Sequence, residues 1–182
     1  MQTGHYTIVE TAIGACGLAW MGERITRFRL PEHDRAVTER RLQSRTGADA
    51  PSEPSPAIAR TISKLQRYFE GERIAFDEAE IALPRVSEFF ERVYAEARAL
   101  PWGETATYGE IARRAGVADG AQAVGQAMGS NPLPIIIPCH RVLAAGAKLG
   151  GFSAYGGVVT KQKLLAMEGV HFDGGQPSLP GL

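Results

Sequence analysis

Apolar and polar positions alternate along residues 5–30, and glycines interrupt the alternation. Residues 6–9, Tyr-Thr-Ile-Val, are of types that favour strands, and Gly22 stands where a hairpin turn would precede residues 25–30. Alternation broken in this way is typical of half-buried strands joined by tight turns. The pattern predicts two or three antiparallel strands.

The period changes further along the chain. Residues 43–56 are turn formers and small polar residues, which indicates a loop. Ile58, Ile62, Leu65 and Phe69 then follow with helical spacing, and Gly71 is a suitable C-terminal stop. Residues 74–83 favour one further strand. Together these segments predict a small α+β domain.

The second half of the chain is patterned mainly as helices. Ser87 is placed to cap a first helix, and Thr107 with Glu110 forms the pattern of a capping box. Asp119 is placed to cap the next helix, and a last helix is expected over residues 158–168. The two short helices joined by a tight turn, after Thr107 and after Asp119, predict a helix-turn-helix.

The predicted fold class is therefore α+β. A small N-terminal domain with an antiparallel sheet and a helix occupies residues 1–84, and a mostly helical domain with the helix-turn-helix occupies residues 85–171. Residues 172–182 are rich in glycine and proline and are expected to form a flexible tail.

The second helix of the pair carries almost no side-chain bulk. Its small residues are Ala121, Ala123, Gly125, Ala127 and Gly129. Small residues allow close approach of whatever lies against a helix. Two interpretations follow: close packing on another helix, or a recognition helix pressed into a DNA groove.

Composition narrows the class of protein. The chain of 182 residues has 20 basic and 20 acidic residues, so its overall charge makes no case for nucleic acid. Residues 98–171 alone carry 7 basic and 4 acidic residues. No apolar run is long enough for a membrane span, residues 1–20 do not resemble a signal peptide, and the two cysteines are expected to be free thiols in the cytoplasm.

The segment PIIIPCHRVL, residues 134–143, places Cys139 and His140 side by side after an apolar run. A cysteine becomes reactive as its thiolate, which a basic neighbour promotes. Adjacent side chains on a strand point to opposite faces, so contact requires a turn or a bridging water. Glu168 is a candidate to orient the histidine. The alternatives are a buried inert thiol and a zinc site, although the chain has no CxxC or HExxH motif.

These residues, together with several further blocks, resemble the O6-alkylguanine-DNA alkyltransferase family, also called methylated-DNA–protein-cysteine methyltransferases. The resemblance spans residues 87–171 and extends through PWGETATYGEIARRAG, AVGQAMGSNPLPIIIPCHRVLAAG, GGFSAYGG and KLLAMEG, in family order. It is looser over the N-terminal half, where it implies a ribonuclease H-like domain.

The family resemblance implies direct DNA repair in a single turnover. The protein would bind double-stranded DNA through the minor groove and flip out an O6-alkylguanine. It would then transfer the alkyl group irreversibly to its own cysteine, with O4-alkylthymine as a second candidate substrate. No cofactor and no metal are implied, and a monomer is expected.

The resemblance also implies a role for each site residue. Cys139 would accept the alkyl group, His140 would act as base through a water, and Glu168 would orient the histidine. Asn131 would hold the loop leading into the site, and Tyr108 would contact the flipped nucleotide and assist the leaving base. Arg141 is expected to be structural. The residues expected to bind DNA are Tyr108, Gln122, Ala121, Ala123, Gly125, Ser153 and Tyr155.

Two departures from the family pattern bear on DNA binding. Gln122 stands where the family usually has an arginine that fills the space left by the flipped guanine, and it lacks the charge and the planar fork. The GGFSAYGG loop is longer than in common members, so Ser153, Ala154 and Tyr155 all stay candidates to face the guanine. Tyr155 or Phe152 is expected to supply apolar surface.

Three functions other than repair are possible for a chain with these motifs. A lesion-recognition protein that does not repair would lack the cysteine, whereas Cys139 is present. A cysteine hydrolase would need an oxyanion hole, which no segment identifies, and a helix-turn-helix regulator would need a sensor domain.

Overall fold

The computed structural model describes residues 4–173 and 176–178. Their contacts divide the chain into two compact units, Met1–Pro84 and Arg85–Leu182, each of which is described by itself. In the described part of the chain, no helix is long and apolar enough to cross a membrane.

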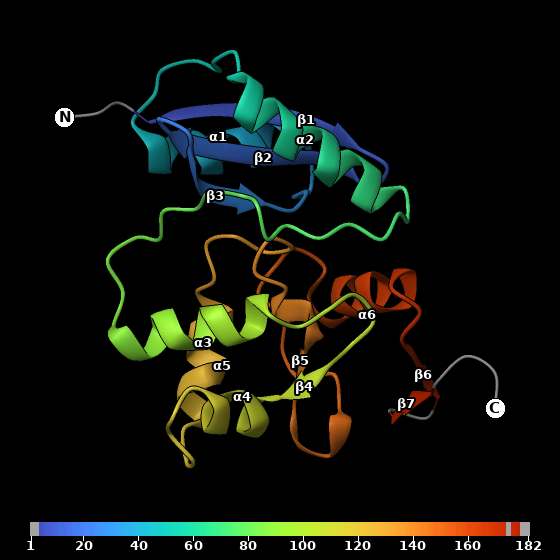
Figure 1. Ribbon diagram of the computed structural model, residues 1–182. Coiled ribbons are helices and arrows are strands. Elements are labelled where there is room, and N and C mark those ends of the chain that lie inside the picture. Colours follow the sequence, from blue (N-terminus) through green and yellow to red (C-terminus); the bar gives the residue numbers. More distant parts are fainter. Residues whose placement is uncertain (1–3, 174–175, 179–182) are drawn as a thin grey trace. The chain divides into compact units, whose positions relative to one another are not determined.

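The first unit is built on a three-stranded antiparallel sheet (Figure 1). Its strands lie in sequence order and are β1 (His5–Thr11), β2 (Gly14–Met21) and β3 (Arg24–Arg29). The alternation along residues 5–30 therefore predicted the sheet correctly. A bulge between Ala19 and Trp20 shifts the β2–β3 register.

Two helices cover opposite faces of this sheet: α1 (Arg35–Thr46) and α2 (Pro56–Phe69). On one face, Leu42 of α1 lies so close to Gly17 that a Cβ there would come within 2.8 Å of its Cδ2 atom. On the other, the rings of Phe28 and Phe69 stack with centroids 6.4 Å apart. Neighbouring residues on a strand point to opposite faces, so Gly17 faces α1 whereas Leu18 and its partner Phe28 face α2.

The α2 helix follows its sequence signals. Ser55 caps its N-terminus, Pro56 occupies the first turn, and Gly71 adopts a left-handed φ of 90° just beyond its end. The strand expected over residues 74–83 is wrong. Ile81 forms an isolated bridge to Ile25 through hydrogen bonds of Ile25 with Glu80 and Ala82, and the rest of the segment is not assigned to a strand.

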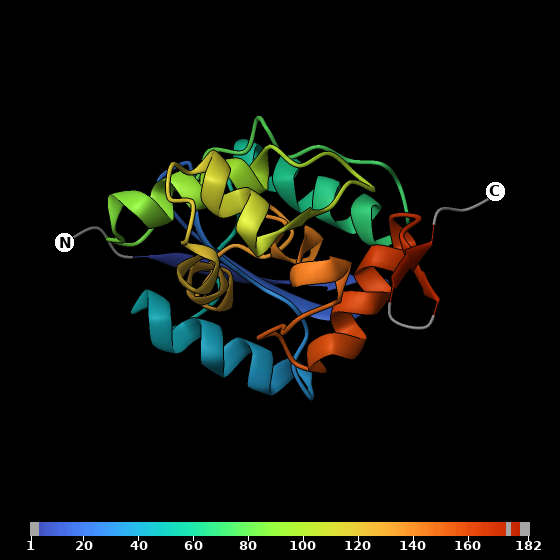
Figure 2. The ribbon, with the colours of Figure 1, turned by 90° about the horizontal axis from the view of Figure 1, so that it is seen from below.

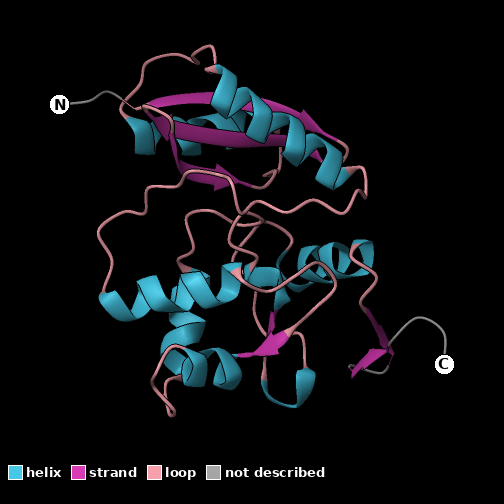
Figure 3. Ribbon diagram, viewed as in Figure 1, coloured by secondary structure: helices cyan, strands magenta, loops and turns pink. Residues whose placement is uncertain are grey.

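The second unit is mostly helical and contains the predicted helix-turn-helix (Figure 3). Its first helices are α3 (Glu88–Arg98), α4 (Tyr108–Arg114) and α5 (Ala121–Gly129). The Ser87 cap and the Thr107–Glu110 capping box are present as predicted. The Asp119 cap is wrong: α5 starts after Gly120 and has no side-chain cap.

A short parallel strand pair connects α4 to the cysteine segment. It joins β4 (Ala106–Thr107) to β5 (Val142–Leu143). A 3₁₀ turn, η1 (Cys139–Arg141), immediately precedes β5, and a second, η2 (Ala145–Ala147), follows it. The strand that follows the cysteine turn is thereby paired with the strand that leads into α4.

The chain continues through α6 (Gly157–Met167) to a small antiparallel pair, β6 (His171–Asp173) and β7 (Gln176–Ser178) (Figure 2). The tail was expected to be flexible from residue 172. Within its described part, backbone pairing joins Phe172 to Pro177 and Asp173 to Gln176, and the flexibility of the tail stays a prediction. Residues 174–175 and 179–182 lie outside the described residues.

Candidate active site

The segment before Cys139 is a buried loop held by Asn131. The Nδ2 atom of Asn131 donates to the carbonyl of Ile137 at 2.8 Å, and its Oδ1 atom accepts from the amide of Leu133 at 2.9 Å. Between these anchors, Ile135 adopts a left-handed φ of 75°, which is a strained conformation for a β-branched residue. Asn131 therefore bonds both sides of this loop, at the position where the family resemblance implies a residue that holds it.

Cys139 begins the η1 turn and lines a cavity of about 400 Å³. Its side chain is almost fully buried, and it is a free thiol. The cavity is lined by Tyr108, Gly125, Met128, Gly129, Cys139, Gly151, Phe152 and Ser153. The thiol thus faces a space bordered by Tyr108 of α4 and by Gly125, Met128 and Gly129 of α5.

The surroundings of Cys139 favour the neutral thiol in the free protein. Burial raises the pKa of the Cys139 thiol, and this effect exceeds the opposing influence of the Asn131 side chain and the positive charge of Lys161. A base is therefore needed to produce the thiolate.

His140 is fully buried, and its Nε2 atom lies 2.8 Å from Oε1 of Glu168. A carboxylate can only accept a hydrogen bond, so Nε2 carries the proton and the lone pair of the neutral ring lies on Nδ1. Glu168 stands directly after α6, at its C-cap. Because Cys139 and His140 lie in the η1 turn and not in a strand, their side chains need not point to opposite faces.

Arg141 contributes more to the site than a structural role alone implied. Its Nε and Nη2 atoms donate to the two oxygens of Glu168 at 2.8 and 2.9 Å, and Nη1 donates to the carbonyl of Leu100. The amide of Gly103 adds a weaker bond to Glu168 at 3.3 Å. The carboxylate is therefore shared between a histidine and an arginine from the same turn.

These contacts set the charges of the pair. Burial opposes ionisation of Glu168, but hydrogen bonds from His140 and Arg141, together with the positive charge of Arg141, hold its pKa well below the usual range. Burial lowers the pKa of His140, and Glu168 only partly offsets that effect. The site therefore combines an ionised carboxylate with a neutral imidazole suited to act as a base.

Tyr108 is the first residue of α4 and lines the cavity together with Cys139. Burial raises the pKa of its hydroxyl, and the nearby Cys139 adds to this effect. Its phenol is therefore a neutral proton donor at ordinary pH.

The predicted DNA-binding residues of α5 divide into two groups. Ala121 and Gln122 are exposed at the start of the helix, and Ala123 and Gly125 are half-buried. Of the four, only Gly125 lines the cavity, where a Cβ would meet no atom within 4 Å.

In the longer loop before α6, some residues line the cavity and others do not. Ser153 lines the cavity, and Phe152 rather than Tyr155 supplies the apolar surface. Tyr155 is 55% exposed and does not line the cavity. Sequence reasoning could not decide between them because loop direction depends on packing.

Lys161 is the buried charged residue that sequence reasoning missed. It is fully buried on α6, and its Nζ atom donates to the carbonyl of Val142 at 2.6 Å. A signal was present: helical spacing places Lys161 on the same face as Leu164 and Leu165.

Other candidate chemistry lies apart from this site. Burial raises the pKa of Cys16 to about 12, so this thiol in β2 stays protonated at ordinary pH. In the described chain, no three His, Cys, Asp or Glu residues are grouped to hold a metal ion.

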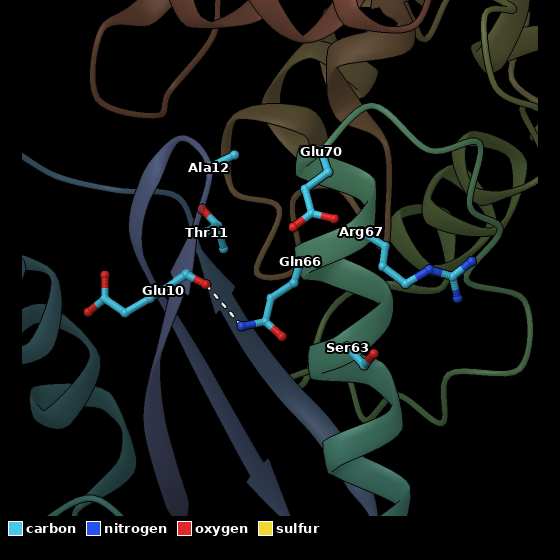
Figure 4. A pocket seen from close by; sticks show the side chains of 7 residues that line it. All are labelled: Glu10, Thr11, Ala12, Ser63, Gln66, Arg67 and Glu70. Carbon is cyan, nitrogen blue, oxygen red and sulfur yellow. Dashed lines mark hydrogen bonds between the residues drawn. The ribbon is translucent and has the colours of Figure 1, made fainter.

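The first unit has a cavity of its own, of about 460 Å³, between the end of β1 and α2 (Figure 4). Gln66 donates to the backbone carbonyl of Glu10 across it, at 3.0 Å. Its lining contains no cysteine or histidine. Of these two cavities, only the one in the second unit is lined by a cysteine.

Comparison with known proteins places this site in a family. Residues 88–170 match the family described as "6-O-methylguanine DNA methyltransferase, DNA binding domain". A methylated-DNA–protein-cysteine methyltransferase of Mycolicibacterium paratuberculosis is 41% identical, over 92% of this chain and 93% of its own. A constitutive one of Bacillus subtilis is 33% identical, over 82% and 86%.

Solved structures agree with these matches. The structure of Mycobacterium tuberculosis OGT in complex with DNA superimposes with a TM-score of 0.71 at 37% identity, covering 90% of this chain and 92% of that one. The structure of the O6-methylguanine methyltransferase of the same organism gives 0.72 at 36%, over 91% and 92%. Since this similarity extends over nearly the whole length of both chains, the protein belongs to the methylated-DNA–protein-cysteine methyltransferase family.

Proposed function

We propose that this protein repairs alkylated DNA directly, by moving the alkyl group of O6-alkylguanine in duplex DNA to its own Cys139. The observation that carries the proposal is the position of Cys139 in a cavity bordered by Tyr108 of α4 and Gly125 of α5. A base held in a duplex cannot reach a buried thiol, so the guanine must be flipped out of the stack into that cavity.

The reaction is a single displacement. His140 takes the Cys139 proton through a water, and the sulfur attacks the alkyl carbon. A carbon–sulfur bond forms as the carbon–oxygen bond breaks, the electron pair passes to the guanine, and the proton finally rests on that base. The thioether is stable, so each molecule acts once and needs no cofactor.

The neighbours of Cys139 support these steps. Glu168 holds His140 with Nδ1 as the basic nitrogen, which is the arrangement that a proton acceptor requires. The neutral Tyr108 hydroxyl can donate to the departing guanine as negative charge develops on it. Asn131 holds the loop that presents the sulfur.

We further propose that α5 enters the minor groove. Ala121, Ala123 and Gly125 keep this helix narrow, and Gln122 is exposed where it can occupy the space left by the flipped base. Ser153 would contact the guanine from the cavity wall, and Tyr155 would contact the DNA outside it. One copy of the chain contains all of these residues, and we expect it to act as a monomer.

Intact-protein mass spectrometry tests the proposal. After incubation with duplex DNA containing O6-methylguanine, one methyl increment should appear on Cys139 and be absent from Cys139→Ser. Cys16→Ser is the matched control and should be methylated normally. Binding without a mass change would instead indicate lesion recognition without repair, and multiple turnovers on an ester would indicate a hydrolase.

A further inference from the structure

Lys161 is a buried cation to which neither the family pattern quoted above nor the proposed mechanism gives a role. Its side chain is fully buried near the start of α6. Its Nζ atom donates to the carbonyl of Val142 at 2.6 Å and to that of Gly151 at 3.4 Å, and it lies 5.8 Å from the centroid of the Tyr108 ring.

The two carbonyls belong to different walls of the site. Val142 follows the η1 turn that carries Cys139, whereas Gly151 belongs to the loop that lines the cavity. The ammonium group therefore links the segment after Cys139 to the loop that lines the cavity through these two hydrogen bonds. Burying a lysine is costly unless its charge is compensated, so a role connected with a negative charge is indicated.

The buried ionised groups of this unit leave the charge of Lys161 unbalanced. Arg141 and Glu168 neutralise each other through two hydrogen bonds. Lys161, by contrast, forms no ion pair with a carboxylate within the described residues, and its hydrogen bonds are to carbonyl oxygens. A thiolate at Cys139 would supply the missing negative charge.

We propose that Lys161 is a positioning residue that stabilises the thiolate of Cys139 by its positive charge and holds the Gly151 side of the cavity through its hydrogen bonds. The inference rests on the proposed function and deepens it, because it names the group that lowers the energetic cost of forming a thiolate in a buried position.

The electrostatics of the site support this assignment. Burial lowers the pKa of Lys161 to about 8, while the adjacent Cys139 acts to raise it. The same charge lowers the pKa of Cys139 against the effect of burial. The other groups facing Cys139 are the hydroxyls of Tyr94 and Tyr108, the amide of Asn131 and the neutral His140, none of which is a permanent cation.

The pH dependence of Cys139 alkylation by iodoacetamide tests the inference without DNA. Lys161→Met removes the charge and keeps the length of the side chain. We expect it to raise the apparent pKa of Cys139 by about one unit, and so to lower the labelling rate near pH 7 about tenfold. Lys163→Met, on the exposed side of the same helix, is the matched control and should leave the profile unchanged.

A reciprocal measurement uses a protein that keeps Lys161. In Cys139→Ser the thiolate partner is absent, so the pKa of Lys161 measured by NMR should be lower than in the wild type. An unchanged Lys161 pKa there, or an unchanged Cys139 profile in a folded Lys161→Met, would overturn the inference. Failure of methyl transfer from DNA with these shifts intact would reject the proposed function alone.

Discussion

The Nε2 atom of His140 lies 2.8 Å from Oε1 of Glu168, although 28 residues separate them in the chain and both side chains are fully buried. The same carboxylate accepts two hydrogen bonds from Arg141. A single residue at the end of α6 thus orients the candidate base and neutralises the arginine beside it.

Removing the charge of Glu168 should destabilise the fold as well as the site. We expect Glu168→Gln to lower the free energy of unfolding by about 3–5 kcal/mol, because Arg141 is left buried without its counter-charge. Urea denaturation measures the loss. The double variant Arg141→Met/Glu168→Gln should be less destabilised than the sum of the single variants, and strict additivity would show that the two groups are not coupled.

Acid should destabilise the protein through the same pair. Burial lowers the pKa of folded His140, and bonding to His140 and Arg141 lowers that of folded Glu168, so the unfolded chain binds more protons at mildly acidic pH. The free energy of unfolding should therefore fall as pH drops from about 7 to 4, by up to about 1.4 kcal/mol per pH unit for each proton bound.

The measurement is a series of urea midpoints across that range of pH. In His140→Gln the part of the slope between about pH 6.5 and 5 should disappear, because the titrating ring is gone. A wild-type profile that is flat from pH 7 to 4 would contradict the assigned charges.

Restoring an arginine at position 122 should strengthen DNA binding. A charged donor gains about 1 kcal/mol over a neutral one, so Gln122→Arg should bind duplex DNA about fivefold more tightly, or flip the base faster. Fluorescence anisotropy and 2-aminopurine emission report the two steps. Gln126→Arg adds the same charge one turn later and is the control. If Gln122→Arg changes neither step, the interpretation of position 122 is wrong.

Replacing Gly125 with alanine should stabilise the fold but slow repair. A Cβ at Gly125 meets no atom within 4 Å, so Gly125→Ala should raise the free energy of unfolding by about 0.5–1 kcal/mol through its helix propensity. The added methyl group also enters the cavity face of α5. We expect methyl transfer from DNA to slow about tenfold, equivalent to about 1.4 kcal/mol in the barrier.

Thermal unfolding and single-turnover rates measure the two effects of that change. Gly109→Ala provides the comparison, since Gly109 lies on α4 with open space around it and does not line the cavity. A Gly125→Ala protein that transfers at the wild-type rate would show that this face of α5 is not pressed against the substrate.

Much of the fold could be predicted from local signals. The β1–β3 strands, the Ser87 cap and the Thr107–Glu110 box depend on residues close in sequence, and all are present. The α1 helix escaped prediction because it is mostly polar and buries only Thr38 and Leu42. Whether residues 74–83 pair as a strand likewise depended on tertiary packing, because their pairing partner is the backbone of β3.

For the site, the sequence by itself determined the chemical types: a cysteine beside a histidine, a carboxylate near the end of the last helix, and a helix of small residues. Only the tertiary structure decided that Glu168 bonds Arg141 as well as His140, that Phe152 rather than Tyr155 lines the cavity, and that Lys161 is buried against the segment after Cys139. The reason is physical. Residue type and short spacing set local backbone and reactivity, whereas distances between segments far apart in the chain, and the charges that burial shifts, arise only once those segments pack.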